Sequence, residues 1–126
     1  MELKTDSNGR YVVNYGTYGS ILCAVRRNGN SPAKKFLESL DESMLRRFYV
    51  LFKKMVSCGQ ITNRKQFKKV QDDIWEFKRF QHRIGCFREG PDLVLTHGFV
   101  KKDKKWRREE IEKAQQIMRV DKDRIV

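Results

Sequence analysis

Basic, imidazole and aromatic side chains gather between residues 78 and 106, where they could act together on a phosphate group. They are Lys78, Arg79, His82, Arg83, Arg88, His97, Lys101, Lys102 and Trp106. A lysine or histidine exchanges protons near neutral pH when neighbouring positive charges lower its pKa. Arginine binds phosphate through two parallel hydrogen bonds, and an aromatic ring stacks on an unpaired base. These residue types predict chemistry on a phosphodiester.

RNA suits these side chains because it carries its own nucleophile, the 2′-hydroxyl, beside the phosphodiester. A protein then has to remove that proton, stabilise the phosphate and protonate the leaving 5′-oxygen. None of these steps requires a metal, and neither a metal nor another cofactor is expected. The sequence contains no GxGxxG, P-loop, HExxH or GxSxG motif. A basic rim that is merely solvated is the alternative left open by composition alone.

Positive charge is unevenly distributed along the 126 residues, whose formal net charge is +12. Residues 60–108 carry 14 basic and 6 acidic side chains, whereas residues 109–126 carry 4 and 5. Crowded like charges repel one another, so an isolated chain gains nothing from gathering them. The expected partner is therefore a polyanion, nucleic acid first and an anionic membrane second.

Composition predicts a single globular domain that stays in the cytoplasm. No apolar run approaches the roughly 20 residues of a membrane span, and the first ten residues contain no apolar signal region. The basic residues fall on predicted strands and turns and not opposite an apolar helical stripe, so a membrane-surface protein is a weak alternative. Cys23, Cys58 and Cys86 lack CxxC spacing and are predicted to be reduced core residues.

Local patterns predict the elements that must position these side chains. Residues 1–30 contain two β-prone runs, "RYVVNY" and "SILCAV". Ser31 and Asp41 are suitable N-caps for two helices, Pro32 suits a first helical position, and Gly59 suits a C-terminal cap. The short link between these helices predicts an αα-hairpin.

The second half of the chain changes from a basic linker to strands. Three strands are predicted in "IWEFKRF", "HRIGCFRE" and "DLVLTHGFV", and a helix in "RREEIEKAQQIM". The expected fold is α+β, with a small antiparallel sheet, an N-terminal αα-hairpin and a C-terminal helix. It forms one domain over residues 1–126, in which 1–30 are an atypical β-rich segment, 31–118 the core and 119–126 a tail.

Several segments resemble the phage-derived, HigB-type branch of the RelE/ParE toxin superfamily. They are "SPAKKFLESL", "FKKMVSCGQITNRKQFKKV", "IWEFKRF", "HRIGCF" and, most specifically, "LVLTHGFVKKDKKWRREEIEKAQQ". The resemblance spans about residues 31–118. It implies a RelE-like fold, a cognate antitoxin (a small helix-turn-helix protein) that covers the site, and cleavage of mRNA on the ribosome that inhibits growth.

The resemblance also implies roles for individual residues. Arg83 matches an arginine that binds the scissile phosphate, and Lys78 is a phosphate binder or the general base. Lys101 and Lys102 match a basic pair that stabilises the phosphate or protonates the leaving oxygen. His82 stands where the family usually has an aromatic residue and is a further catalytic candidate.

Other residues are expected to bind RNA or to support the site. The RNA-binding candidates are Arg79, Lys104, Lys105, Trp106 and Arg107, with Trp106 stacking on a base. Glu76 is interpreted first as a salt-bridge partner that orients Lys78 or Arg83, and second as a proton-transfer group. His97 is expected to be a hydrogen-bonded, half-buried residue.

The predicted function is the toxin of a type II toxin–antitoxin pair, a metal-independent endoribonuclease that acts on mRNA. The alternative is a non-catalytic protein of the same fold that binds nucleic acid or a protein partner such as gyrase.

Overall fold

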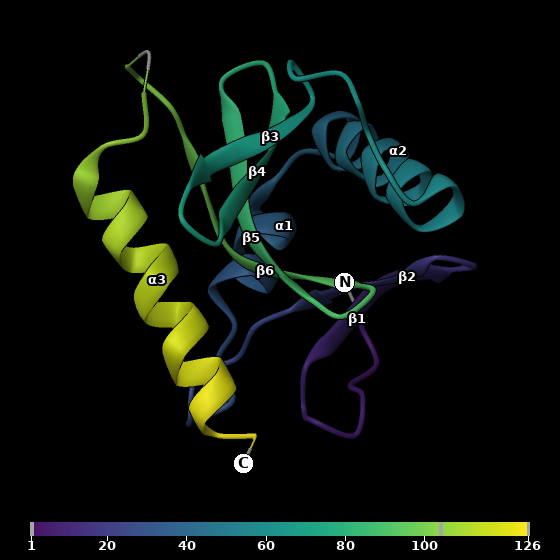
Figure 1. Ribbon diagram of the computed structural model, residues 1–126, viewed down its shortest axis with the longest axis vertical. Coiled ribbons are helices and arrows are strands. Elements are labelled where there is room, and N and C mark those ends of the chain that lie inside the picture. Colours follow the sequence, from purple (N-terminus) through teal and green to yellow (C-terminus); the bar gives the residue numbers. More distant parts are fainter. Residues whose placement is uncertain (1, 104, 126) are drawn as a thin grey trace.

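Six strands and three helices make up the part of the chain that the structure describes, residues 2–103 and 105–125. The computed structural model orders them as β1 (Tyr11–Gly16), β2 (Gly19–Cys23), α1 (Pro32–Ser39), α2 (Glu42–Cys58), β3 (Phe67–Gln71), β4 (Ile74–Arg79), β5 (His82–Glu89), β6 (Asp92–Val100) and α3 (Arg108–Asp123). The strands form one sheet in the order β1-β2-β6-β5-β4-β3. Helices α1 and α2 pack on one face of this sheet, and α3 packs on the other (Figure 1).

This architecture shows that the predicted fold is wrong. The protein is α+β, but its sheet has six strands and is mixed, because β2 and β6 pair in parallel. The helical pair is not N-terminal, since β1 and β2 precede it. The predicted basic linker also contains a strand, β3. Local hydrophobic period does not encode which distant segments pair, so the parallel contact of Ile21 with Leu93 was not predictable from it.

Helix α1 begins at the predicted N-cap Ser31, and α2 begins and ends at the predicted caps Asp41 and Gly59. The Ser31 side chain accepts a hydrogen bond from the N–H of Lys34, and Asp41 accepts one from Met44 at 2.7 Å. Gly59 ends α2 with φ of 81°, in the left-handed region that favours glycine. Each cap contributes about 1 kcal/mol to helix stability.

The main hydrophobic core lies between the sheet and the pair α1 and α2. Phe48 and Phe52 of α2 are fully buried, and the Phe52 ring meets the Phe77 ring edge-on at 5.0 Å. On the opposite face α3 buries Ala114 and Ile117. Each large apolar side chain buried in this way contributes about 1.5–3 kcal/mol. The two layers hold the ends of β4, β5 and β6 in a fixed register.

A buried network joins the segment before β1 to α3. Arg10 donates from Nε (2.9 Å) and Nη2 (2.6 Å) to Oδ2 of Asp121, and from Nη1 to Glu89. Oδ1 of Asp121 accepts from the N–H of Val25 and from Arg124, each at 3.0 Å. Residues 119–123, predicted as part of a tail, therefore lie in α3 and contribute a buried carboxylate.

The cysteines are free thiols in two different environments. Cys23 and Cys86 are buried as predicted, and burial raises the pKa of Cys23 to about 12. Cys58 is exposed at the end of α2, so its predicted place in the core is wrong. Among the described residues, none of the helices is both long and apolar enough to span a bilayer.

Candidate functional site

Basic side chains of three neighbouring strands share the sheet face that carries α3. Lys78 of β4 lies opposite Arg83 of β5, and Arg83 lies opposite Phe99 of β6. Side chains alternate between the two faces of a strand, so Glu76, two residues before Lys78, lies on the same face. Glu76 in turn lies opposite Lys68 of β3. The register of β3, β4 and β5 therefore places three cations around one carboxylate.

The Arg83 guanidinium is buried and held from several sides. Its Nη1 donates to the backbone oxygens of Phe80 and His82, and its Nε lies 3.0 Å from Oε1 of Glu76. That contact is a charge contact without the angle of a hydrogen bond, and both atoms lack a hydrogen-bond partner among the described residues. Burial lowers the pKa of Arg83, and the Glu76 charge raises it. The described residues make no hydrogen bond to Nη2.

Lys101 brings a further cation to this cluster from the end of β6. Its side chain is only 7% exposed, and its backbone N–H donates to the oxygen of Gln81 at 2.7 Å. Burial lowers the pKa of Lys101, and the nearby Arg83 charge lowers it further, whereas Glu76 raises it. The pKa of Lys78 is lowered by burial too, with smaller effects from Lys68 and Arg83 against the opposing effect of Glu76. A lowered pKa favours the neutral amine, the form that accepts a proton.

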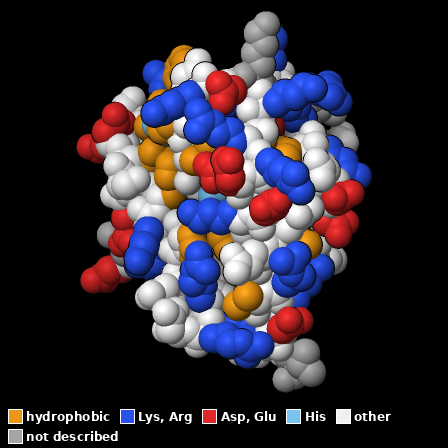
Figure 2. All heavy atoms as spheres, turned by 90° about the vertical axis from the view of Figure 1, so that its left-hand side faces the viewer, with side chains coloured by type: hydrophobic (Ala, Val, Ile, Leu, Met, Phe, Trp, Pro, Cys, Tyr) orange, Lys and Arg blue, Asp and Glu red, His pale blue; other side chains and the backbone are white. Residues whose placement is uncertain are grey.

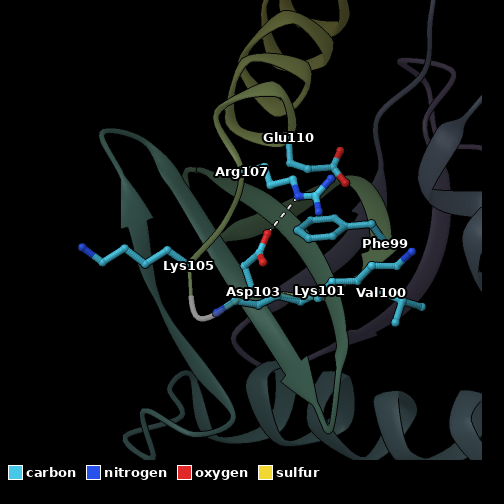
Figure 3. A pocket seen from close by; sticks show the side chains of 8 residues that line it. Phe99, Val100, Lys101, Asp103, Lys105, Arg107 and Glu110 are labelled. Atoms are coloured by element: carbon cyan, nitrogen blue, oxygen red, sulfur yellow. Dashed lines mark hydrogen bonds and ion pairs between the residues drawn. The ribbon is translucent and has the colours of Figure 1, made fainter.

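Two adjoining hollows open beside these residues. The larger has a volume of about 330 Å³ and is lined by Lys68, Glu76, Lys101, Lys105 and Trp106, among others. The smaller, of about 120 Å³, lies between the end of β6 and the start of α3. Figure 3 shows the Lys101 side chain running along it beside Phe99, while Lys105 points away from the other labelled side chains. Lys101 and Lys105 both line the two hollows, and of these two residues Lys101 is the buried one.

The surface around the site is broadly basic. On the α3 side of the molecule, Lys and Arg side chains spread over the whole face, with acidic and apolar side chains between them (Figure 2). Within the described part of the chain, no three His, Cys, Asp or Glu side chains are grouped as metal ligands. The groups that Lys68, Lys78, Arg83, Lys101 and Glu76 bring to this site are amines, a guanidinium and one carboxylate.

The predicted catalytic residues divide into two groups. Lys78, Arg83 and Lys101 come together, whereas Lys102 is exposed and lines only the smaller hollow. His82 lies on the opposite face of the sheet, with its ring 6.2 Å from that of Phe36 in α1. The structure therefore does not join His82 to the cluster.

The predicted RNA-binding residues are also dispersed. Arg79 lies on the α2 side, where its Nε donates to the Arg47 oxygen at 3.2 Å. Lys105 and Arg107 are exposed in the segment before α3, and a hydrogen bond to Asp103 raises the pKa of Arg107. Lys104 lies outside the described residues.

Trp106 is packed inside the protein. It is 8% exposed, and its ring stands edge-on to Phe99 at 4.7 Å. A Cβ at Gly85 would lie 2.8 Å from the Trp106 ring, so glycine makes room for it. This placement argues against the base-stacking role predicted for Trp106, because its ring is not offered to solvent.

Lys68 and Glu76 are more central to the candidate site in the structure than the sequence pattern indicates. Lys68 was overlooked because "FKKVQ" is basic enough to resemble a linker, although its alternation of buried and exposed positions is that of an edge strand. The predicted salt bridge of Glu76 is found with Arg83. His97, expected to be half-buried, is 1% exposed, and burial lowers its pKa to about 3. Its neutral ring lies 3.3 Å from both Thr96 Oγ1 and Glu110 Oε1, and so links β6 to α3.

Comparison with known proteins identifies the family. Residues 35–119 match the family described as Phage derived protein Gp49-like (DUF891), which is more than half of the chain and includes Lys78, Arg83 and Lys101. The chain belongs to this family. Membership confirms the phage-derived part of the predicted resemblance for this Gp49-like chain, while the HigB-type branch stays a prediction.

A solved structure similar to this Gp49-like chain is the RelB–RelE antitoxin–toxin complex from Methanococcus jannaschii. The two share 12% sequence identity with a TM-score of 0.48, over 64% of this chain and 88% of that chain. No site residue is transferred from so distant a match. The comparison with curated proteins finds no match.

Proposed function

We propose that this chain is the toxin of a toxin–antitoxin pair and an endoribonuclease that cleaves mRNA on the ribosome without a metal ion. Its main support is the cluster in which Lys68, Lys78, Arg83 and Lys101 surround the single carboxylate of Glu76. Arg83 and Lys101 are buried and Lys68 and Lys78 are half-buried, so this excess of positive charge is unfavourable until an anion arrives. Membership of the phage-derived family and the resemblance of the site segments to HigB-type toxins support the same function.

Arg83 binds the scissile phosphate in this mechanism. Glu76 and two backbone oxygens fix the guanidinium, so little conformational entropy is lost when Nη2 meets a phosphate oxygen. The guanidinium also stabilises the negative charge that builds up on the phosphate in the transition state.

Lys78 and Lys101 carry the proton transfers. One of them, as the neutral amine, takes the proton of the 2′-hydroxyl, whose oxygen then forms a bond to phosphorus. The other, as the ammonium, gives a proton to the 5′-oxygen as the phosphorus–O5′ bond breaks, which leaves a 2′,3′-cyclic phosphate and a 5′-hydroxyl. The lowered pKa of both lysines makes the neutral amine more accessible than it is for a free lysine.

The proposed partners, the mRNA on the ribosome and an antitoxin, are those expected for the positive charge of this cluster. The ribosome positions the mRNA, which converts a weak collision with a small basic protein into an oriented encounter. A cognate antitoxin, a small helix-turn-helix protein in our proposal, occupies the cationic face with an acidic or apolar segment and so excludes RNA.

Expression in cells with and without substitutions tests this function. Wild-type protein should arrest growth, and primer extension on cellular mRNA should show discrete cuts. Lys78→Ala and Arg83→Ala should each relieve arrest and remove the cuts while circular dichroism shows a folded protein. Arg88→Ala is the matched control, because Arg88 is exposed on the same strand and lies over the Phe67 and Trp75 rings on the other face. Full toxicity of both site variants would show that the site is assigned wrongly.

A second function, binding without cleavage, is favoured by the packing of Arg83. Its Nη1 and Nε sides are already engaged by backbone oxygens and Glu76, as in a structural arginine. A family member of this kind would bind nucleic acid or a protein such as gyrase and leave mRNA intact. Growth arrest without cuts in primer extension would support this function over the first.

A further inference from the structure

Phe80 stands at the tip of the two-residue turn between β4 and β5, and its position is unfavourable for a folded protein in two ways. Its side chain is 67% exposed, which leaves a large apolar ring in water. Its backbone φ is 53°, a left-handed conformation that a bulky side chain rarely adopts and that glycine would adopt without strain. A strained, exposed aromatic residue beside a candidate site indicates a role outside the core.

Neighbouring residues hold the Phe80 ring in a defined position. The Arg47 guanidinium of α2 lies over one face of the ring, 5.2 Å from its centre. Arg79 fixes that arrangement by donating from Nε to the Arg47 oxygen at 3.2 Å. One face of the ring is therefore covered by a cation, and the high exposure of the residue leaves the other face open.

The same turn also holds the guanidinium of the candidate site. The backbone oxygen of Phe80 accepts a hydrogen bond from Nη1 of Arg83. An anion bound by Arg83 would consequently lie at the turn that carries the Phe80 ring. In a polynucleotide, a phosphate and the base of the adjoining nucleotide are neighbours along one chain, so both can be bound at one turn.

We propose that Phe80 stacks on an unpaired base of the RNA, next to the phosphate that Arg83 binds. This inference rests on the proposed function and names the residue that holds the base. Stacking on aromatic rings tolerates any base sequence, because every base presents a π-face, and the Arg47 cation adds attraction for the polyanion. The surroundings of Phe80, which include Arg47, Arg79 and the exposed Gln81, suit RNA better than an apolar protein segment.

Replacing Phe80 by glycine tests whether its ring binds RNA or only packs against the protein. Phe80→Gly removes the ring and relieves the backbone strain, so the melting temperature should be unchanged or higher. The affinity for a fluorescein-labelled, unstructured RNA oligonucleotide at low salt should fall roughly 10-fold, measured by anisotropy. Phe80→Trp should restore it. Tyr15→Ala is the matched control, since Tyr15 is an exposed aromatic residue on β1, and it should bind like the wild type.

Oligonucleotides that each lack one base identify the contact. The 10-fold difference between wild type and Phe80→Gly should disappear for the oligonucleotide that lacks the stacked base and persist for the others. Equal binding of Phe80→Gly and wild type, failure of Phe80→Trp to restore binding, or a difference that persists with every abasic oligonucleotide would each overturn the inference. If Arg83→Ala still weakens RNA binding in that case, the proposed function survives. A wild-type protein that binds no RNA overturns both.

Discussion

Arg10 and Arg83 are both buried, at 1% and 6% exposure, but their surroundings differ. Burial lowers the pKa of Arg10, yet hydrogen bonds to Glu89 and Asp121 outweigh it, and the net shift is upward. Arg83 has one carboxylate, Glu76, which does not overcome the effect of burial, so its pKa is lowered. Lys68, Lys78 and Lys101 lie around the same carboxylate.

The difference separates a structural charge from one that is open to a ligand. At the Arg10 end of the sheet, the protein supplies every partner that the guanidinium needs, and the network ties the chain together. At the Arg83 end, positive charge exceeds negative charge, so the protein itself does not supply enough negative charge to neutralise the cluster. The burial of an arginine alone therefore does not distinguish a structural residue from a candidate site, and the surrounding charges have to be compared as well.

The largest expected effect is the loss of stability on replacing Arg10. Arg10→Met leaves the fully buried Asp121 without its main partner and should lower the free energy of unfolding by about 3–5 kcal/mol, measured by urea denaturation. Arg83→Met should cost less, because Glu76 keeps Lys68, Lys78 and Lys101 nearby. Equal losses for the two variants would remove the distinction between the two arginines.

Next in size is the contrast between two adjacent lysines. Lys101→Met should reduce RNA cleavage about 100-fold by removing a buried cation from the cluster. The free energy of unfolding should stay the same or increase, because a buried charge is replaced by an apolar side chain of similar length. Lys102→Met, at an exposed position, is the control and should lose little activity. A larger loss with Lys102→Met would place the chemistry in the smaller hollow.

A moderate effect is expected from His97, which links β6 to α3 as a neutral ring. Its pKa of about 3 in the folded protein lies below the ordinary 6.5, so between these values the unfolded chain binds the extra proton. Stability is therefore complete above about pH 6.5 and falls by up to about 1.4 kcal/mol per pH unit as the solution becomes more acidic. In His97→Gln, the unfolding free energy should change about 2 kcal/mol less than in wild type between pH 6.5 and pH 5. Parallel curves for the two proteins would contradict the buried, neutral ring.

The smallest expected effect concerns Lys68, which lowers the pKa of both Lys78 and Lys101. Lys68→Gln removes a like charge, so both pKa values should rise and a smaller fraction of each amine is neutral at pH 7. Cleavage at pH 7 should fall roughly threefold, and the pH–rate profile should move to higher pH. Lys53→Gln, at an exposed position of α2 on the other face of the sheet, is the control and should leave the profile in place.

Local chemistry explains what the sequence predicted correctly. Ser31, Asp41 and Gly59 act on residues within four positions of themselves, so the start of α1 and both ends of α2 could be predicted from spacing alone. Lys78 and Arg83 come from strands joined by a two-residue turn, and their pairing also follows from nearby sequence. The parallel pairing of β2 with β6 depends on the whole chain and has no local pattern.

The face on which a side chain lies was harder to predict than the strand that carries it. His82 and Arg83 are neighbours, yet they point to opposite faces of β5. In β6 an irregularity of register opposite Ile84 and Cys86 shifts the alternation, which determines where the residues after it point. Trp106 is predicted to stack on a base of the RNA, but in the structure it fills the space that Gly85 leaves.

The contact between Arg10 and Asp121 spans 111 positions, which has a consequence for synthesis on the ribosome. A chain emerges from its N-terminus, so the first hairpin is made long before the last turns of α3 that secure it. Long-range pairing of this kind folds late and slowly. A nascent chain that stalls before residue 121 would contain all six strands but lack the carboxylate that holds Arg10, and the native arrangement becomes complete only when almost the entire polypeptide has been translated.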